Sequence, residues 1–250
     1  MLLMGIAIGS GLELTRGGGQ APSASSRAVS YPSATGGGWP FHRKIPAYML
    51  TSAHGAPLSL RALRGKVVIL APSLTLCHEI CPMTTQALMR VHEALAAAGL
   101  ANRVALVEAT VDPWRDSPAR LRAYTRLTGS SRLIQLTASV AQMRRFWDFF
   151  GIGFRRVPQG KPPDTDWWTG RPETFDVEHV DGLFIIDQSG YERSFFPGQA
   201  NVGGRLNPAL KRLLSRTGLQ NLAHPVEGWT VDQVLAATGR LLGVHISYPA

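Results

Sequence analysis

The chain has 250 residues, of which 44% are hydrophobic, 8% aromatic and 17% charged. This is enough for one full-sized core with material left for tails or insertions, and it excludes a wholly disordered protein. The net charge is +9, but 22 of the 26 basic residues are arginines that stand scattered or in pairs. Because no helix-turn-helix, ribonucleoprotein motif or zinc finger accompanies them, we expect no nucleic-acid partner. An anionic membrane surface or an acidic protein patch is the better match for this charge.

Residues 1–38 are predicted to lie outside the folded domain. Met1 to Gly11 is a short apolar stretch with no basic residues before it, too short to span a bilayer. Gly17 to Gly38 consists mainly of Gly, Ser, Ala and Pro, a composition typical of a flexible tether. The apolar stretch could be the end of a signal or anchor, or it could have no function of its own. After it we expect a tether and then a single domain over residues 39–250.

From residue 39 onward, strand and helix patterns alternate. A strand pair is expected over 47–60 with its turn at His54-Gly55, and the β-branched run 66–70 predicts a buried strand, followed by a loop over 72–81. The later expected elements are a helix from Pro82 to about Gly99, a strand over 103–111, a helix over 118–128 capped by Ser117, a strand over 133–136, a helix over 140–150, an irregular segment over 153–176, a hairpin over 182–196, and helices over 208–216 and 230–242. This alternation predicts a layered α/β fold with a central mixed sheet.

Cys77 and Cys81 are the two cysteines of the chain, and they stand at the junction between the predicted buried strand and the helix that Pro82 opens. At such a junction, unpaired backbone N–H groups and the helix dipole lower the pKa of a thiol. The pair can therefore form a reversible disulfide or supply two soft thiolates to copper. The simpler interpretation is that both cysteines are structural, either as buried thiols or as a permanent disulfide. A disulfide that closes so short a loop, however, adds little to the stability of the fold. Two sulfurs are also too few for a four-cysteine zinc site.

A third metal ligand would have to be a histidine from elsewhere in the chain. His179 lies just before the strand expected over 182–187, and the start of that strand can face the end of the strand that carries the cysteines. His78 is adjacent to the cysteines but would point in a different direction from both. The pattern therefore favours His179 over the other histidines, most of which we expect to be surface or internally satisfied residues.

Four motifs in order along the chain carry a family resemblance. They are Gly65-Lys66-Val67-Val68-Ile69-Leu70, Cys77-x3-Cys81-Pro82, Val111-Asp112-Pro113-x-Arg115-Asp116-Ser117-Pro118, and His179 ahead of a strand that ends Ile186-Asp187-x-x-Gly190. Together they resemble the Sco/SenC family, copper-binding proteins with a thioredoxin-like fold that assist cytochrome c oxidase assembly. The resemblance covers about residues 45–200.

The resemblance implies a function and a set of ligands. Cys77, Cys81 and His179 would bind copper, as Cu(I) or Cu(II), and the protein would be a metallochaperone that delivers copper during cytochrome c oxidase assembly. Its partner would be the copper-bearing subunit of the oxidase or another copper protein. The resemblance also implies an exported, membrane-anchored protein that faces the periplasm or the cell exterior.

The sequence departs from the family in the loop before and between the cysteines. Ala71 to Thr75 stands where family members usually carry Phe-Gly-Tyr-Thr, and His78-Glu79 stands where Pro-Asp is frequent. The segments 155–176 and 200–228 are expected to be insertions. Within the first, Trp167 and Trp168 could contact a partner or pack over the core.

The acidic motif of the resemblance leaves two carboxylates to interpret. Asp112 could stand behind a metal ligand. For Asp116 we favour a role confined to a turn and a helix cap, next to Ser117.

Other functions on the same fold remain open. A thiol-disulfide oxidoreductase could use Cys77 and Cys81 as a redox-active pair, for example on cysteines of a copper site. Against it, three residues separate the cysteines where a thioredoxin has two, and no proline stands in a convincing position before the late strand. A thiol peroxidase would need a Pro-x-x-x-Thr-x-x-Cys pattern, which is absent. A non-catalytic interaction module is a further alternative. We therefore expect no classical enzyme beyond a possible thiol-disulfide oxidoreductase.

Overall fold

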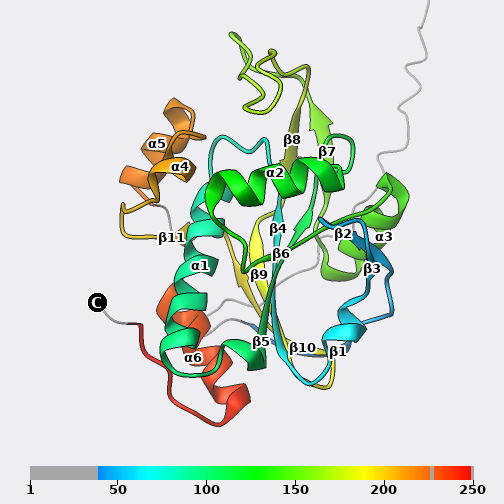
Figure 1. The fold of residues 1–250 in the computed structure, drawn as a ribbon, viewed down its shortest axis with the longest axis vertical. Coiled ribbons are helices and arrows are strands. Elements are labelled where there is room, and N and C mark those ends of the chain that lie inside the picture. Colours follow the sequence, from blue (N-terminus) through cyan, green and yellow to red (C-terminus); the bar gives the residue numbers. More distant parts are fainter. Residues whose placement is uncertain (1–38, 226–227, 249–250) are drawn as a thin grey trace, which may run out of the picture. The chain divides into compact units, whose positions relative to one another are not determined.

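The computed structural model describes residues 39–225 and 228–248, so the segment and tether predicted over 1–38 lie outside the described residues. A mixed sheet of eight strands forms the centre of the domain, in the order β1-β10-β9-β4-β5-β6-β2-β3 (Figure 1). The strands are β1 (Trp39–Lys44), β2 (Leu50–Ser52), β3 (Pro57–Leu58), β4 (Val67–Ser73), β5 (Val104–Thr110), β6 (Ile134–Thr137), β9 (Gly182–Ile186) and β10 (Tyr191–Pro197). β4, β5 and β6 run parallel, and the other neighbours pair antiparallel. The predicted α/β class with a mixed sheet is confirmed.

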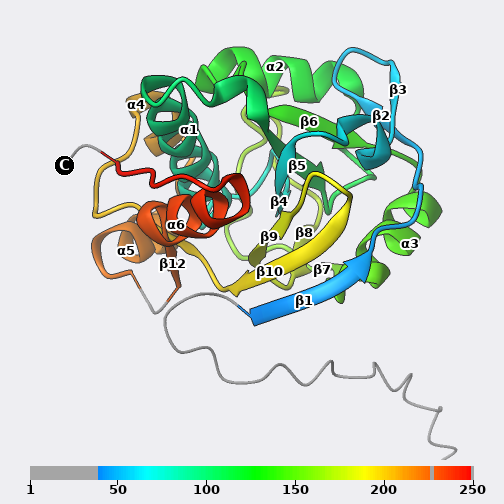
Figure 2. The same cartoon turned by 90° about the horizontal axis from the view of Figure 1, so that it is seen from below.

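Helices cover both faces of the sheet. The helices of the described residues are α1 (Cys81–Ala97), α2 (Pro118–Thr128), α3 (Val140–Phe150), α4 (Pro208–Lys211), α5 (Arg216–Ala223) and α6 (Val231–Leu242). Figure 2 shows α1 and α6 on one side of the sheet and α3 on the other. Alternate residues of β4 follow this division: Val67 and Ile69 pack with α1 and α6, whereas Val68 and Leu70 pack with α3. A strand covered on both faces needs a continuous apolar run, which is what residues 67–71 provide.

The helix boundaries with strong local signals were predicted correctly. Ser117 caps α2 by accepting a hydrogen bond from the Arg120 N–H (3.3 Å), and the helix stops at Gly129, which has a positive φ of 72°. α3 spans the predicted residues 140–150. The expected hairpin around residues 188–190 is the β9–β10 pair. No helix within the described ranges is long and apolar enough to cross a bilayer.

Several sequence-based predictions of local structure were wrong. The loop predicted from residue 72 begins later, because β4 continues through Pro72 and Ser73. The Val111 N–H donates to the Ser73 carbonyl (2.9 Å), so Pro72, one residue earlier, directs its nitrogen to the opposite side. There the β9 pairing has already ended at Leu70–Phe184, and the missing N–H interrupts no ladder.

The segment 153–176 is not wholly irregular as predicted. Its two ends form β7 (Phe154–Val157) and β8 (Asp176–His179), which pair antiparallel across the intervening loop. The single helix predicted over 208–216 is instead the short α4, and a second helix, α5, begins at Arg216. The segment 200–228 therefore contains two helices and the short strand β11 (Ala200–Asn201), which pairs with β12 (Trp229–Thr230).

Candidate metal centre

The two cysteines meet at the start of α1. β4 ends at Ser73, and the chain then turns so that the Cys77 N–H donates to the Leu74 carbonyl (3.3 Å). Cys81 is the buried first residue of α1, and its N–H donates to the Cys77 sulfur (3.3 Å). The N-cap residue of α1, Ile80, makes no side-chain hydrogen bond to the helix. The Cys77 sulfur accepts the first N–H of the helix instead and so takes the place of a side-chain cap. Both cysteines are free thiols.

This arrangement divides the two thiols into an acidic and a weakly acidic partner. The hydrogen bond from the Cys81 thiol lowers the pKa of Cys77 to about 7, burial acts against it, and the backbone N–H groups of Cys81 and Glu79 assist. The pKa of Cys81 is raised well above its usual value, because its proton is held by the Cys77 sulfur and because the thiol is buried. Cys77 is therefore the thiolate of the pair near neutral pH.

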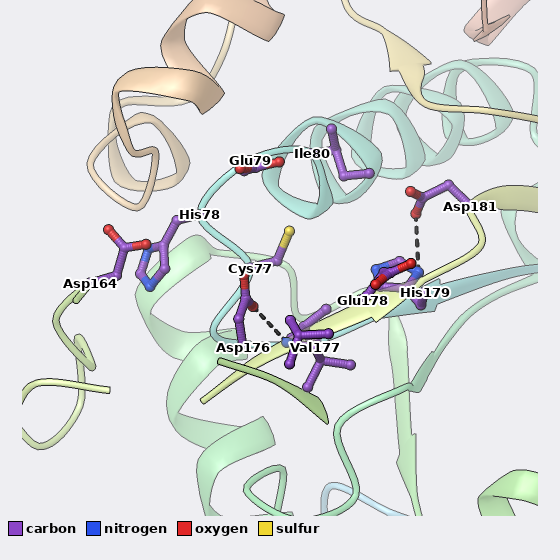
Figure 3. Close-up of a pocket in the computed structure, with 12 residues that line it drawn as sticks. Cys77, His78, Glu79, Ile80, Asp164, Asp176, Val177, Glu178, His179 and Asp181 are labelled. Carbon is purple, nitrogen blue, oxygen red and sulfur yellow. Dashed lines mark hydrogen bonds and ion pairs between the residues drawn. The ribbon is translucent and has the colours of Figure 1, made fainter. Parts of the chain in front are cut away.

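Cys77 and His179 line one pocket of about 320 Å³ (Figure 3). The loop over residues 74–80 forms one wall, and β8 with the turn to Asp181 forms the other. The topology explains this meeting. β9 runs antiparallel to β4, so the residues that precede β9 lie at the end of β4 from which the cysteine loop starts. His179 and Cys77 thus line the same pocket, and the role of His179 as a metal ligand stays a prediction.

The His179 ring is held by its own neighbours. Its side chain is 5% exposed, and Nδ1 lies 3.1 Å from the Val180 carbonyl oxygen and 3.4 Å from Oδ1 of Asp181. An Nδ1–H directed at these acceptors leaves the lone pair on Nε2, which makes no hydrogen bond to the described part of the chain. A carboxylate behind a histidine orients the ring and increases its strength as a ligand. Burial raises the pKa of Asp181, and the charge of His179 acts against this rise.

The structure brings Cys77 and Cys81 together, but it does not bring His179 close enough to complete the predicted set of three ligands. In residues 39–225 and 228–248, no three His, Cys, Asp or Glu side chains are grouped closely enough to hold a metal ion. His179 faces Cys77 across the pocket, and Cys81 lies buried behind Cys77 in the core on the α3 side of the sheet. The donor types nevertheless fit a soft metal ion: one thiolate, one thiol that can lose its proton, and one imidazole with a free nitrogen.

Carboxylates surround the pocket, and sequence reasoning did not find them. Its lining includes five acidic side chains, Glu79, Asp164, Asp176, Glu178 and Asp181, and neither lysine nor arginine. Burial raises the pKa of Glu79, and the neighbouring carboxylates add to this effect. His78 also lines the pocket; burial lowers its pKa, but its hydrogen bonds to Glu173 and Leu213 raise it to about 9, so this side chain carries a positive charge. The five carboxylates outnumber this cation, so the pocket is a negative region in a chain of net charge +9, and it attracts cations.

The contacts of Asp116 differ from those that we predicted. We expected it to belong only to a turn and a helix cap, but its buried carboxylate braces the cysteine loop. It accepts hydrogen bonds from the Thr75 hydroxyl (2.5 Å), the Thr75 N–H (3.2 Å) and the Thr110 hydroxyl (2.6 Å). Thr75 precedes Cys77 by two residues, so Asp116 positions the loop that carries the first thiol.

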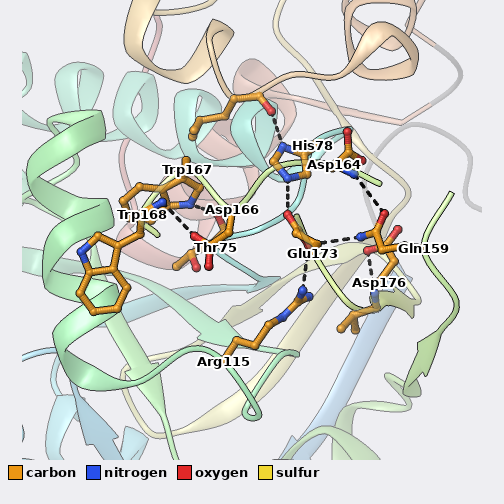
Figure 4. A network of polar contacts seen from close by, with 12 residues as sticks. Thr75, His78, Arg115, Gln159, Asp164, Asp166, Trp167, Trp168, Glu173 and Asp176 are labelled. Atoms are coloured by element: carbon orange, nitrogen blue, oxygen red, sulfur yellow. Dashed lines mark hydrogen bonds and ion pairs between the residues drawn. The ribbon is translucent and has the colours of Figure 1, made fainter. Parts of the chain in front are cut away.

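Asp112, which we considered as a group behind a metal ligand, instead pairs with Arg115 (2.5 Å). Arg115 in turn pairs with Glu173, and Glu173 lies 2.6 Å from Nε2 of His78 (Figure 4). Asp112 is thus linked to the residue between the cysteines and not to His179. The His78 ring is directed toward Glu173 and the Leu213 carbonyl.

The two tryptophans of the segment 155–176 have different environments. The Trp167 indole N–H donates to the Thr75 carbonyl (2.6 Å), and its ring packs near Tyr124. Trp168 is 46% exposed and lies beside the Arg120 guanidinium, which is 4.9 Å from its ring centre. Trp167 therefore packs over the cysteine loop, and Trp168 is the one of the two that remains accessible to a partner.

The lowered pKa of Cys77 predicts the pH dependence of its alkylation. Only the thiolate reacts, so the iodoacetamide rate should rise with pH and reach half its maximum near pH 7, compared with about 8.5 for an ordinary cysteine. In Cys81→Ala, which removes the thiol donor, this midpoint should move upward. Mass spectrometry of the metal-free, reduced protein measures both rates. A wild-type midpoint above pH 8 would contradict the proposed sharing of the Cys81 proton.

The fold and the site define a class of protein, the thioredoxin-like α/β proteins that carry a cysteine pair at the start of the first core helix. In this chain a histidine that precedes β9 faces the cysteine pair. Residues 40–214 match the SCO1/SenC family, and the chain belongs to this family.

Related proteins and structures agree with this assignment. A candidate copper-binding protein from Stutzerimonas stutzeri is 32% identical over 165 residues, which cover 66% of this chain and 74% of the relative. An SCO2-like protein from Rickettsia prowazekii is 25% identical over 152 residues, covering 60% of this chain and 67% of the relative. The copper-bound structure of ScoI from Bradyrhizobium japonicum superimposes with a TM-score of 0.52 at 19% identity, and covers 73% of this chain and 99% of that one. The structural likeness supports the thioredoxin-like fold.

Proposed function

We propose that this protein is a copper metallochaperone that holds one copper ion with Cys77, Cys81 and His179. The observation that carries the proposal is the Cys77 thiolate, paired with Cys81 and facing His179 across one pocket. Thiolates and imidazole together suit copper, and thiolates in particular select Cu(I). Membership of the SCO1/SenC family and a relative described as copper-binding support the same ion.

The chain's own groups have distinct parts in this proposal. Cys77, with its pKa of about 7, offers the first sulfur as a thiolate in a large share of the molecules near neutral pH, and Cys81 releases its proton as the ion binds. His179, whose Nδ1 is held by Val180 and Asp181, offers Nε2 from the opposite wall of the pocket. The acidic lining of the pocket concentrates cations at its mouth.

We further propose that the acceptor is the copper-bearing subunit of cytochrome c oxidase, the partner of the family's assembly role. Three ligands leave a Cu(I) ion open on one side, so a partner's cysteines can displace them one at a time. The protein would act outside the cell or in the periplasm, tethered to the membrane through its N-terminal segment. The excess of arginines would favour an anionic membrane surface.

A thiol-disulfide oxidoreductase is the second candidate, and one observation favours it. A low-pKa cysteine beside a buried thiol is the arrangement of an attacking and a resolving cysteine. In this function Cys77 would attack a disulfide of the partner, and Cys81 would release the mixed disulfide.

Incubation with the soluble copper domain of the oxidase from the same organism separates the two functions. Copper-loaded protein mixed with the reduced, metal-free domain should lose its copper to the domain, as measured by metal content after chromatography. Retention of copper by the loaded protein would contradict the delivery role. Metal-free reduced protein mixed with the oxidised domain tests the alternative, and rapid appearance of two thiols per domain would support it.

A further inference from the structure

We infer that His78 is a positioning residue, through which Glu173 and residues 213–218 clamp the loop between the two cysteines and favour its dithiol state over the disulfide. The inference concerns the same cysteines as the proposed function, but it does not depend on copper. We call Glu173, Leu213, Ser215 and Gly218 the loop clamp.

The side chain of His78 is held at both ring nitrogens. Nδ1 lies 2.7 Å from the Leu213 carbonyl oxygen, and Nε2 lies 2.6 Å from Oε1 of Glu173. The ring is 12% exposed, so these contacts are largely protected from water. A histidine between a carbonyl and a carboxylate from two distant segments fixes both position and orientation of the loop.

The backbone of the loop is held as well. The Ser215 N–H donates to the His78 carbonyl (2.8 Å), and the Ser215 hydroxyl caps α5 by accepting from the Gly218 N–H (3.2 Å). A Cβ at Gly218 would lie 2.3 Å from the His78 carbonyl oxygen and 3.1 Å from the Cα of Glu79. The first turn of α5 therefore lies directly against the cysteine loop, and only glycine fits at this contact.

The other half of the clamp is anchored in the loop between β7 and β8. The buried Glu173 carboxylate accepts hydrogen bonds from Arg115 (2.8 Å) and from the Gln159 side-chain amide (3.2 Å) (Figure 4). Both segments that sequence analysis marked as insertions, 155–176 and 200–228, thus converge on His78. Ser215 and Gly218 lie beyond residues 40–214, which match the family.

The clamp bears on the redox chemistry of the pair. The loop is held where the Cys81 N–H reaches the Cys77 sulfur, with both thiols free. A disulfide requires the sulfurs to approach to about 2.05 Å with a defined dihedral angle, so the backbone between them must adjust. Contacts that resist this adjustment favour the dithiol. That is the form that can bind a metal ion or reduce a partner.

Equilibration with glutathione tests the inference without metal. Cys77 and Cys81 lose two protons and two electrons as their disulfide forms, and one glutathione disulfide is reduced to two glutathione molecules. His78→Gln keeps a polar side chain but can engage only one of the two partners, and Gly218→Ala pushes α5 off the loop. Both variants should shift the equilibrium toward the disulfide by about tenfold, which lowers the reduction potential by about 30 mV.

His54→Gln is the matched control, because it makes the same change at an exposed histidine in the turn between β2 and β3 that does not line the pocket. Its equilibrium constant should equal that of the wild type. Circular dichroism of the dithiol forms checks that each variant is folded. If Gly218→Ala does not fold, the test of the inference rests on His78→Gln. An unchanged equilibrium in His78→Gln would overturn the inference. Failure of copper to bind would contradict the proposed function and leave the glutathione result intact.

Discussion

Cys77→Ser is expected to weaken Cu(I) binding by about a thousandfold or more, equivalent to about 4 kcal/mol, while the protein stays folded. Cys77 is the acidic thiol of the pair and the sulfur that faces the pocket. Serine has nearly the same size, but its hydroxyl neither ionises at neutral pH nor offers a soft donor. Competition with a chromogenic Cu(I) chelator measures the dissociation constant of the reduced protein.

Two further variants give this prediction its controls. His179→Ala should weaken binding less than Cys77→Ser, because two sulfurs remain. His54→Ala should have no effect, because this exposed histidine lies in the turn between β2 and β3 and does not line the pocket. An affinity of Cys77→Ser within threefold of the wild type would show that the copper ion binds elsewhere.

Asp116→Ala is expected to lower the free energy of unfolding by about 3 kcal/mol and to loosen the cysteine loop. The carboxylate accepts three hydrogen bonds, two from Thr75 and one from Thr110, and all three donors are buried. A buried donor left without a partner costs about 1–3 kcal/mol, and partial relaxation of the loop reduces the sum. Urea unfolding measures the loss, and faster alkylation of Cys77 would report the loosened loop.

Asp116→Asn is the matched variant, since it keeps the shape and part of the acceptor capacity. Burial raises the pKa of Asp116 to about 7, with the charge of Asp112 adding to the effect. When the pKa of a carboxyl is higher in the folded than in the unfolded state, its contribution to the stability of the fold decreases as pH rises from the unfolded pKa to the folded pKa. The deficit of Asp116→Asn relative to the wild type should therefore be smaller at pH 8 than at pH 5. Equal stability of Asp116→Ala and the wild type would contradict the bracing role.

Local signals in the sequence predicted most of the central fold. The start of α2 is marked by Ser117 and Pro118, and its end by Gly129. The run 67–71 has the apolar composition of a strand that is buried on both faces. β1, β7 and β8 lacked such signals. β7 carries Arg155 and Arg156, both exposed, and pairs with β8 across a long loop, so no alternation of polar and apolar residues marks it.

The candidate site divides in the same way. The spacing of Cys77 and Cys81 and the position of His179 before a strand could be interpreted from the sequence, because strand order determines which ends of strands meet. The partners of His78 could not, since Glu173 and Leu213 lie 95 and 135 residues away along the chain. Asp116 was misinterpreted for a related reason: its neighbours suggest a helix cap, whereas its contacts with Thr75 join positions 41 residues apart.

X-ray absorption at the copper edge tests the central claim most directly. The protein loaded with one Cu(I) ion should show two sulfur neighbours and one nitrogen neighbour, and His179→Ala should lose the nitrogen while both sulfurs remain. This result would establish Cys77, Cys81 and His179 as the ligands. Retention of the nitrogen neighbour in His179→Ala, or a single sulfur neighbour in the wild type, would contradict the proposed site.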